Sequence, residues 1–451
     1  MKKAVALVLV LCLVCLMFAG CGGNGNAPAS SQPATESTGS SSSEANVEPV
    51  TIEFLFGSQP MLEWFEEFFP DLISGDNPDK ITVQAEFQKE ATQILQMKAA
   101  TNEIPDMVSL GLPQEMINQG KFLDLSEGPW WDNTLPSTKE LSTDVKSGKV
   151  YTVPMGSGAV GIFYNTEILE SLNIEVPETW EEFVAALEKV KAEMPDVTPM
   201  YMGGKESWSL GHITEFTLMG VAKQELGFVD YETAMAESDL EALGWNEDAD
   251  GVLATFAKCM MELKEKELVN SNVVTATTDN LADAFVNGKA AFVSQGMWAL
   301  ATMQEKNPDF KSIGFMAYPS IMPDTKPSVG GPLEGQIAIS ASSSPEEIAA
   351  AKKVLERMTS PDAMKAFCEK NGTIPARTDV DANWSFIKDE VKEVLGSAQV
   401  EMFTQNLPGA FNSDEYGRLV QNIFVDKYAT PEDFARDYLA MWNSAYEAAN
   451  G

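Results

Sequence analysis

Side chains that could carry out catalysis or bind a metal are scarce in this sequence. A single histidine, His212, stands among 451 residues. Zinc sites built on histidine clusters are therefore excluded, and a Ser-His-Asp or Cys-His nucleophile is disfavoured because only one position could serve as its base. Residues 246–251 match the start of a calcium-binding loop, but Ala257 occupies the position of the required glutamate. This segment is predicted to be a solvated turn before a helix.

Acidic residues are abundant, with 67 Asp and Glu against 31 Lys and Arg and a formal net charge of −36. This charge argues against nucleic acid and an anionic membrane surface as electrostatic partners, because both would repel it. A glycoside hydrolase would need two carboxyl groups about 5–10 Å apart around one bond. Glu66 and Glu67 are a candidate pair, but adjacent helical residues point in different directions. A tethered hydrolase is therefore the least favoured alternative, and we expect no enzyme.

The N-terminus has the pattern of an export signal. Lys2 and Lys3 precede an apolar run that ends before Cys21, and the run is too short for a comfortable membrane span. We expect a signal peptide over residues 1–20. The Phe-Ala-Gly-Cys sequence resembles a bacterial lipobox, which implies that Cys21 is lipidated; an ordinary cleaved signal is the alternative.

Residues 21–48 are expected to form a flexible tether after the lipidated cysteine. Gly, Asn, Ser, Thr, Ala and Pro dominate this stretch, and such a composition cannot offset the entropy of ordering. A tether of this length would span about 30 Å on average. Cys259 and Cys368 remain in the body, either as one disulfide or as two buried thiols, and they lack the spacing of a metal site.

From Val50 onward, short apolar strands alternate with longer helical patterns, which indicates an α/β fold. Strands are predicted at residues 51–56, 81–83 and 105–110. Thr179 with Glu182 three residues later is a predicted capping box, and Ser344-Pro345-Glu346-Glu347 is a second helix start. Hydrophobic residues make up 44% of the chain, enough for substantial cores.

A series of short motifs runs through this body in a specific order. They are Ile104-Pro105-Asp106, residues 148–154, 161–165, 177–183 and 284–292, then Gly296-Met297-Trp298, Ser360-Pro361-Asp362 and residues 374–377. Together they resemble the family 1 extracellular solute-binding proteins, in particular the maltodextrin-type sugar receptors of ABC importers. The resemblance covers the chain from about Val50 to the C-terminus. Each motif alone is weak, and their common order makes the resemblance specific.

The resemblance implies a two-lobed periplasmic-binding-protein-like fold with a hinge and a ligand cleft between the lobes. By analogy, lobe 1 comprises residues 49–155 plus 319–378, and lobe 2 comprises residues 156–318 plus 379–451. Gly156, Ser157 and Gly158 are the expected hinge, because glycine absorbs backbone rotation at little cost.

A neutral sugar requires flat aromatic rings for its C–H faces and polar side chains for its hydroxyls. Trp298 is the expected stacking platform, because it occupies the position of the family's ligand-stacking tryptophan; a core role is the alternative. Trp208 is predicted to lie exposed on a Gly/Ser-rich loop, residues 203–208, and is a second candidate. Tyr416 and Asn412 follow the motif Leu407-Pro408-Gly409, where maltodextrin-type receptors place another aromatic residue.

Polar ligand contacts are predicted at positions near strand ends or motif glycines. They are Ser58, Gln59, Asp106, Gln295 and Glu334. Asp106 has an alternative role as a cap at the end of a strand or helix.

The expected function is that of a substrate-binding lipoprotein that captures a neutral sugar or oligosaccharide by lobe closure. It would deliver the sugar to the permease subunits of an ABC importer. We expect a monomer, anchored by lipid to the extracytoplasmic face of a bacterial membrane, without cofactor or metal. A polyamine, peptide or metal chelate is the alternative cargo. The chain contains only four arginines, which disfavours an anionic ligand.

Overall fold

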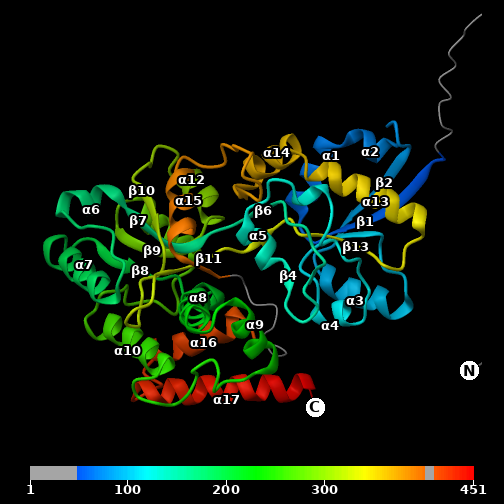
Figure 1. Cartoon of the computed structure of the whole chain (residues 1–451). Coiled ribbons are helices and arrows are strands. Elements are labelled where there is room, and N and C mark those ends of the chain that lie inside the picture. The colour runs from blue at the N-terminus through cyan, green and yellow to red at the C-terminus, as the bar shows by residue number, and fades with distance from the viewer. Residues whose placement is uncertain (1–47, 402–410, 451) are drawn as a thin grey trace, which may run out of the picture. The chain divides into compact units, whose positions relative to one another are not determined.

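The first predicted strand lies at the centre of a four-stranded sheet. The structure is a computed structural model that describes residues 48–401 and 411–450. In it, β1 (Val50–Phe56) pairs in parallel with β2 (Ile81–Phe87) and β3 (Met107–Ser109), and β13 (Ile337–Ile339) joins β3 as an antiparallel edge. We call this sheet with its helices the first lobe (Figure 1).

Helices cover both faces of this sheet because the strands alternate their side chains. Ile52, Phe54 and Phe56 of β1 are buried in one cluster with residues of α1 and α13, whereas Leu55 is buried in another with residues of α3 and α4. The elements of the lobe outside the sheet are α1 (Gln59–Phe68), α2 (Pro70–Ser74), α3 (Ala91–Thr101), α4 (Gln114–Asn118), η1 (Pro129–Trp131), α5 (Pro136–Leu141), the hairpin β4 (Thr143–Asp144) and β5 (Lys149–Val150), α13 (Pro345–Met358) and α14 (Pro361–Asn371).

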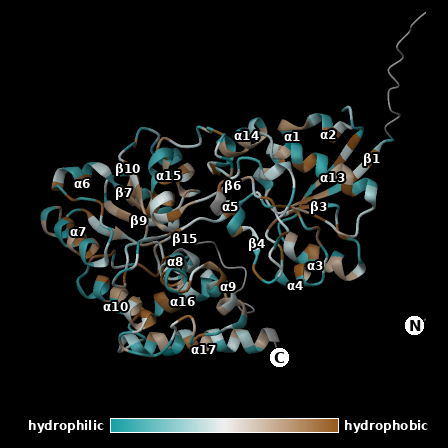
Figure 2. Cartoon of the chain, viewed as in Figure 1, coloured by the Kyte–Doolittle hydropathy of each residue, from teal (hydrophilic) through white to brown (hydrophobic). Residues whose placement is uncertain are grey.

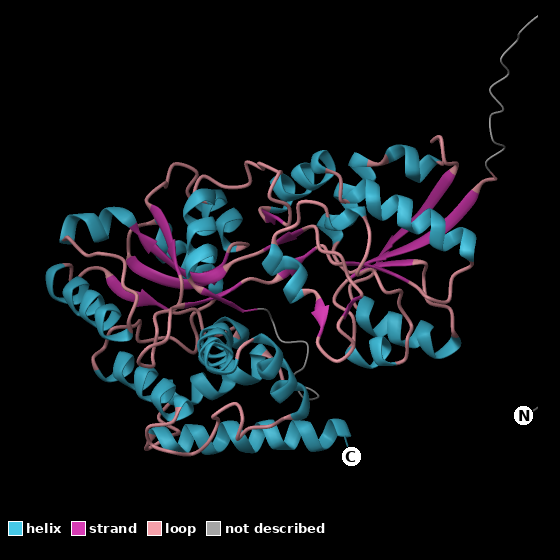
Figure 3. Cartoon of the chain, viewed as in Figure 1, coloured by secondary structure: helices cyan, strands magenta, loops and turns pink. Residues whose placement is uncertain are grey.

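A six-stranded mixed sheet forms the centre of the second lobe. Its order is β15 (Gln399–Glu401), β11 (Ser328–Gly330), β7 (Val160–Asn165), β9 (Ala290–Gly296) and β8 (Thr198–Tyr201), and β10 (Ile313–Met316) also pairs with β7. The helices of the lobe are α6 (Thr166–Leu172), α7 (Trp180–Glu193), α8 (Ser207–Leu226), α9 (Phe228–Glu237), α10 (Val252–Glu265), α11 (Thr278–Val286), α12 (Ala299–Lys306), α15 (Lys388–Ser397), α16 (Ser413–Phe424) and α17 (Pro431–Asn450). Figure 2 shows hydrophobic residues along the strands, and Figure 3 shows the helices that surround them.

Three short strands connect the two lobes. They form a separate small sheet in the order β12 (Leu333–Glu334), β6 (Gly156–Ser157) and β14 (Ile374–Pro375). The expected hinge residues therefore lie in or directly after β6. Gly156 is required there, because a Cβ atom would lie 2.7 Å from the carbonyl oxygen of Ile374.

The expected return to the first lobe at residue 319 is corrected by the structure. The backbone N–H of Tyr318 donates to Ser328 at 2.7 Å, and the carbonyl of Ser320 accepts from Trp180 at 2.9 Å. These bonds keep residues 318–330 on the second lobe, and β11 is part of its sheet. The chain crosses later, between Gly330 in β11 and Ile337 in β13.

Helices α8 and α16 cross at two glycines. A Cβ atom on Gly211 of α8 would overlap the carbonyl oxygen of Ser413, and one on Gly417 of α16 would overlap that of Ser207. Because backbone atoms occupy both places, only glycine allows this approach. The crossing fixes the N-terminal ends of both helices next to each other.

The two body cysteines are free and buried, which decides between the two alternatives left open by the sequence. Cys259 lies in α10 and Cys368 in α14. Burial raises the pKa of the Cys368 thiol to about 12 and also raises the pKa of the Cys259 thiol. Both side chains are therefore protonated thiols at neutral pH. The segment 246–251, which resembles the start of a calcium-binding loop, precedes α10 as predicted. The Asn246 side-chain oxygen accepts there from the Asp248 backbone N–H at 3.0 Å.

The predicted helix start at Ser344 is a capping box in the structure. The Ser344 hydroxyl accepts from the Glu347 N–H at 3.2 Å, and the Glu347 carboxylate accepts from the Ser344 N–H at 2.8 Å. We expect Ser344→Ala to lower the free energy of unfolding by about 1 kcal/mol, because an N–H at the start of α13 loses its acceptor. Urea unfolding measures this change. Ser271→Ala, at an exposed serine outside any helix, is the control, and an equal shift in both variants would contradict the capping role.

Candidate ligand-binding site

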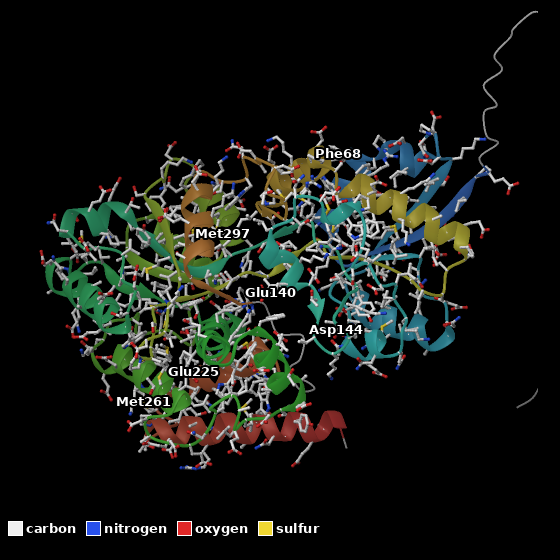
Figure 4. The ribbon with its side chains drawn as sticks, viewed as in Figure 1. Phe68, Glu140, Asp144, Glu225, Met261 and Met297 are labelled. Carbon is white, nitrogen blue, oxygen red and sulfur yellow. The ribbon has the colours of Figure 1, made fainter. Side chains whose placement is uncertain are left out.

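A cleft of about 390 Å³ lies where the parallel strands of the first sheet end. Gly57 and Ser58 follow β1, Lys89 follows β2, and Gly111 follows β3. The carboxyl ends of parallel strands meet at one edge of a sheet, which is where open α/β folds bind ligands. The opposite wall comes from the second lobe, with Gly158, Met297 and Trp298, and the connecting segment Leu333–Gln336 closes the cleft between the walls. Met297 is labelled in Figure 4.

Trp298 presents an indole ring to this cleft. Its side chain is 43% exposed, unusual for so large an apolar residue, and its ring lies over Gly296, where a Cβ atom would overlap it. The indole N–H donates to the Gln295 side-chain oxygen at 3.2 Å, and the Gln295 amide donates in turn to Ser209 at 3.0 Å. The ring is thus held at its polar edge while part of its surface stays uncovered.

Two further aromatic side chains support Trp298 from α8. The ring centroids of Trp208 and Trp298 are 6.4 Å apart, and that of His212 lies 5.2 Å from Trp208 and 5.7 Å from Trp298. Burial lowers the pKa of His212 to about 4, only partly opposed by the nearby negative charge of Asp414. The imidazole is therefore neutral at pH 7 and packs as an aromatic ring.

Glu334 is the only carboxylate among the described residues that line the cleft, and Lys89 is their only ammonium group. Burial raises the pKa of Glu334 to about 7. Nearby, the Gln336 side-chain oxygen accepts from the Thr152 hydroxyl at 3.1 Å, which fixes the amide at the edge of the cleft. The cleft therefore combines one aromatic face with acceptors and donors at its rim.

The structure brings some of the predicted site residues together at the cleft. Ser58, Glu334 and Trp298 line it, Gln295 is buried behind Trp298, and Trp208 packs against the Trp298 ring.

Four other predicted positions lie outside the described lining of the cleft. The predicted ligand contacts at Asp106 and Tyr416 are corrected by the structure. The Asp106 carboxylate is a structural cap that accepts from the Glu53 N–H at 2.8 Å and from the Ser343 hydroxyl at 2.5 Å. Tyr416 is fully buried and packs against Phe411. Gln59 begins α1, is exposed and donates to the Glu63 carboxylate at 3.1 Å. Asn412 caps α16 by accepting from the Asp414 N–H at 2.9 Å. The motif Leu407-Pro408-Gly409 before it lies outside the described residues.

Some lining residues were missed by the sequence reasoning. Lys89 follows β2, but the predicted strand ended at Val83 whereas the observed one continues to Phe87. A correct strand end would have pointed to Lys89 through the rule that ligands bind at carboxyl ends of strands. Asn371 and Thr373, at the end of α14, carry no local signal of a ligand contact.

Comparison with known protein families decides to which family this chain belongs. Residues 74–393, most of both lobes, match the model described as bacterial extracellular solute-binding protein. The chain belongs to the bacterial extracellular solute-binding protein family. Membership places the protein outside the cytoplasm. In residues 48–401 and 411–450, no helix has both the length and the apolar character needed to cross a membrane.

Two relatives with curated names resemble the chain over about three quarters of their length. The multiple sugar-binding protein of Streptococcus mutans is 26% identical over 339 residues, which cover 74% of this chain and 77% of that protein. The melibiose/raffinose/stachyose-binding protein MelE of Bacillus subtilis is 24% identical over 357 residues, covering 76% and 77%.

The fold is also that of solved members of the solute-binding family. The apo form of RafE from Streptococcus pneumoniae superposes with a TM-score of 0.73 at 23% identity, covering 88% of this chain and 98% of that one. RafE in complex with raffinose superposes with a TM-score of 0.68 at 22% identity, covering 88% and 100%.

Proposed function

We propose that this protein is the substrate-binding component of an ABC importer and captures a neutral sugar or oligosaccharide between its lobes. The exposed ring of Trp298 in the interlobe cleft is the observation that carries the proposal. A tryptophan face suits the C–H face of a sugar ring, and the side chains of Ser58, Lys89 and Glu334 suit its hydroxyls. The cleft volume of 390 Å³ lies in the usual range of roughly 300–1,000 Å³ for ligand sites.

The comparisons support a sugar rather than another solute. Relatives covering about three quarters of the chain are named for multiple sugars or for melibiose, raffinose and stachyose, and a structural neighbour holds raffinose. A polyamine or peptide is the second candidate, favoured by Glu334 as a carboxylate in the cleft. The two glutamates considered as a catalytic pair of a hydrolase do not support that function. Glu66 and Glu67 are exposed on α1, and Glu67 forms an ion pair with Lys370 at 2.7 Å.

Capture proceeds by lobe closure. Ligand contacts to both walls, Ser58 on the first lobe and Trp298 on the second, favour the arrangement in which the walls approach. A ligand that touched one lobe alone would shift nothing, however tightly it bound. The closed form then docks on the permease, and no bond of the sugar is broken. Gly156, Ser157 and Gly158 are the residues at which the chain would bend.

The same proposal includes the mode of attachment. Cys21 would carry the lipid and residues 21–48 would tether a monomeric body to the outer face of the membrane. Labelling with a radioactive or alkyne-bearing fatty acid tests this part, and Cys21→Ala would remove the label.

A thermal-shift screen tests the cargo. At a ligand concentration of 100 Kd, binding stabilises the folded state by about 2.7 kcal/mol, which is readily detected. We expect shifts with melibiose, raffinose, stachyose or maltotriose, and no product when the sugar is recovered and analysed. Shifts with polyamines or peptides alone would replace the sugar by the second candidate, and product formation would overturn the receptor function.

A further inference from the structure

Glu334 lies at an unusual place for a charged residue, on a strand that connects the lobes. In β12 it pairs with Gly156 of β6, and its carbonyl oxygen accepts from the Met155 N–H at 3.0 Å. Its carboxyl group lines the cleft close to Gly158, where a Cβ atom would lie 3.4 Å from one carboxyl oxygen. The side chain therefore sits between the two walls that a ligand must bridge.

The carboxyl group has no hydrogen bond or ion pair to any residue in the described part of the chain. Neighbouring backbone and side chains leave this side chain half-buried and shield it from part of the surrounding water, and such shielding disfavours the charged form. An ionised carboxylate accepts hydrogen bonds at both oxygens. Two sugar hydroxyls, or one hydroxyl and a bound water, would supply the donors that the protein does not.

We propose that Glu334 couples ligand capture to the release of a proton, because the ligand's hydroxyl groups donate to its ionised carboxylate and bind the protonated form weakly. This inference rests on the proposed sugar-binding function and concerns the regulation of the same site. Affinity would then depend on the pH at the outer face of the membrane.

Two other titratable groups near the cleft, Cys368 and His212, stay neutral around pH 7. On α14, Cys368 lies beside Gly156, and burial raises the pKa of its thiol to about 12. In the second lobe, His212 lies behind Trp298 and its pKa is lowered to about 4. Lys89 is the cation on the wall of the first lobe, and β6 contributes only Gly156 and Ser157. Glu334 is therefore the group near the ligand that titrates around neutrality.

The sign of the effect follows from linkage. Burial raises the pKa of Glu334 to about 7 in the free protein, and donors from a ligand stabilise the charged form and lower that pKa in the complex. Ligand affinity is then full above pH 7 and falls as the pH drops through the free-state pKa. Between pH 7.5 and pH 6, the dissociation constant should rise by about eightfold if only the ionised form binds.

Isothermal titration calorimetry tests this with melibiose, raffinose, stachyose and maltotriose at pH 7. Each titration is run in phosphate and in Tris, whose ionisation enthalpies differ, so that the difference in binding heat counts the protons released. We expect about half a proton released per sugar bound, because about half of the free carboxyl groups are protonated at this pH. The wild-type protein alone suffices for this measurement.

Two variants assign the proton. Glu334→Gln should bind sugar with a pH-independent affinity and release no proton, and Glu140→Gln, at an exposed glutamate on α5 (Figure 4), should behave as the wild type. Sugar binding with equal heats in both buffers would overturn the proton coupling and leave the receptor function intact. Proton release that persists in a folded Glu334→Gln would also overturn it. Absence of any sugar binding would overturn the receptor function itself and the coupling with it.

Discussion

Trp298→Ala lowers the affinity for the transported sugar by about tenfold to a hundredfold, according to the geometry of the cleft. The variant loses the apolar ring that the sugar face covers, and an aromatic platform contributes about 0.5–1.5 kcal/mol beyond the burial of its area. Together with the lost burial of apolar surface, the binding free energy should weaken by about 1.5–3 kcal/mol, which corresponds to the tenfold to hundredfold loss of affinity. Calorimetric titration measures it. Trp298→Phe keeps a ring in place and should lose less.

Phe386→Ala is a matched control for this variant. Phe386 is 45% exposed, close to the 43% of Trp298, but it lies before α15 and outside the described lining of the cleft. We expect unchanged sugar affinity in this control. Trp298→Ala also loses the ring contacts to Trp208 and His212 and the hydrogen bond to Gln295, so the melting temperature of each variant is measured beside its affinity to verify that it is folded. If Trp298→Ala bound sugar as tightly as the wild type, the stacking platform would have to lie elsewhere.

Gly417→Ala should lower the free energy of unfolding by about 3 kcal/mol, at the upper end of the usual cost of overpacking. The new methyl group would overlap the backbone carbonyl oxygen of Ser207, and backbone cannot rotate away as a side chain can. Helices α8 and α16 would have to separate. Because α8 also carries Trp208, Ser209 and His212, which support Trp298, sugar affinity should fall in the same variant. Urea unfolding and calorimetry measure the two effects.

Gly396→Ala serves as the control for that substitution. Gly396 also lies within a helix, α15, but a Cβ atom there would meet nothing within 4 Å. Alanine is the better helix former by about 1 kcal/mol, so this variant should be as stable as the wild type or more stable. Equal destabilisation by both substitutions would mean that the glycine crossing does not limit the approach of α8 and α16.

Much of the fold could be predicted from the sequence because the signals are local. The apolar alternation of residues 51–56 and the capping chemistry at Thr179 and Ser344 depend on neighbours within a few residues. The structure contains β1 at Val50–Phe56 and both capping boxes. The positions at which the chain crosses between the lobes could not be predicted in this way, because they depend on which strands pair in the folded protein. Tyr318 has no local feature that reveals its bonds to Ser328.

The site could be predicted only in part, because the direction of a side chain is decided by tertiary contacts. Ser58 and Gln59 are neighbours, yet Ser58 lines the cleft while Gln59 begins α1 and bonds within that helix. Tyr416 matched the family by position, but the glycine crossing of α16 and α8 buries that helix and its tyrosine. The prediction for Trp298 came from a family motif, since nothing in the residue spacing distinguishes an exposed tryptophan from a core one.

The pairing of β13 with β3 has a consequence for the order in which the chain acquires its structure. β3 ends at Ser109, and its antiparallel partner begins at Ile337, after nearly all of the second sheet has been made. Until that partner and helix α13 emerge, β3 keeps an unpaired edge, and only α1 covers the face of β1 that α13 later shares. The first lobe therefore cannot finish folding before the strands β7 to β11 of the second lobe have been synthesised. Such long-range pairing slows folding, and any truncated product that ends before Ile337 carries an exposed strand edge on which copies can aggregate.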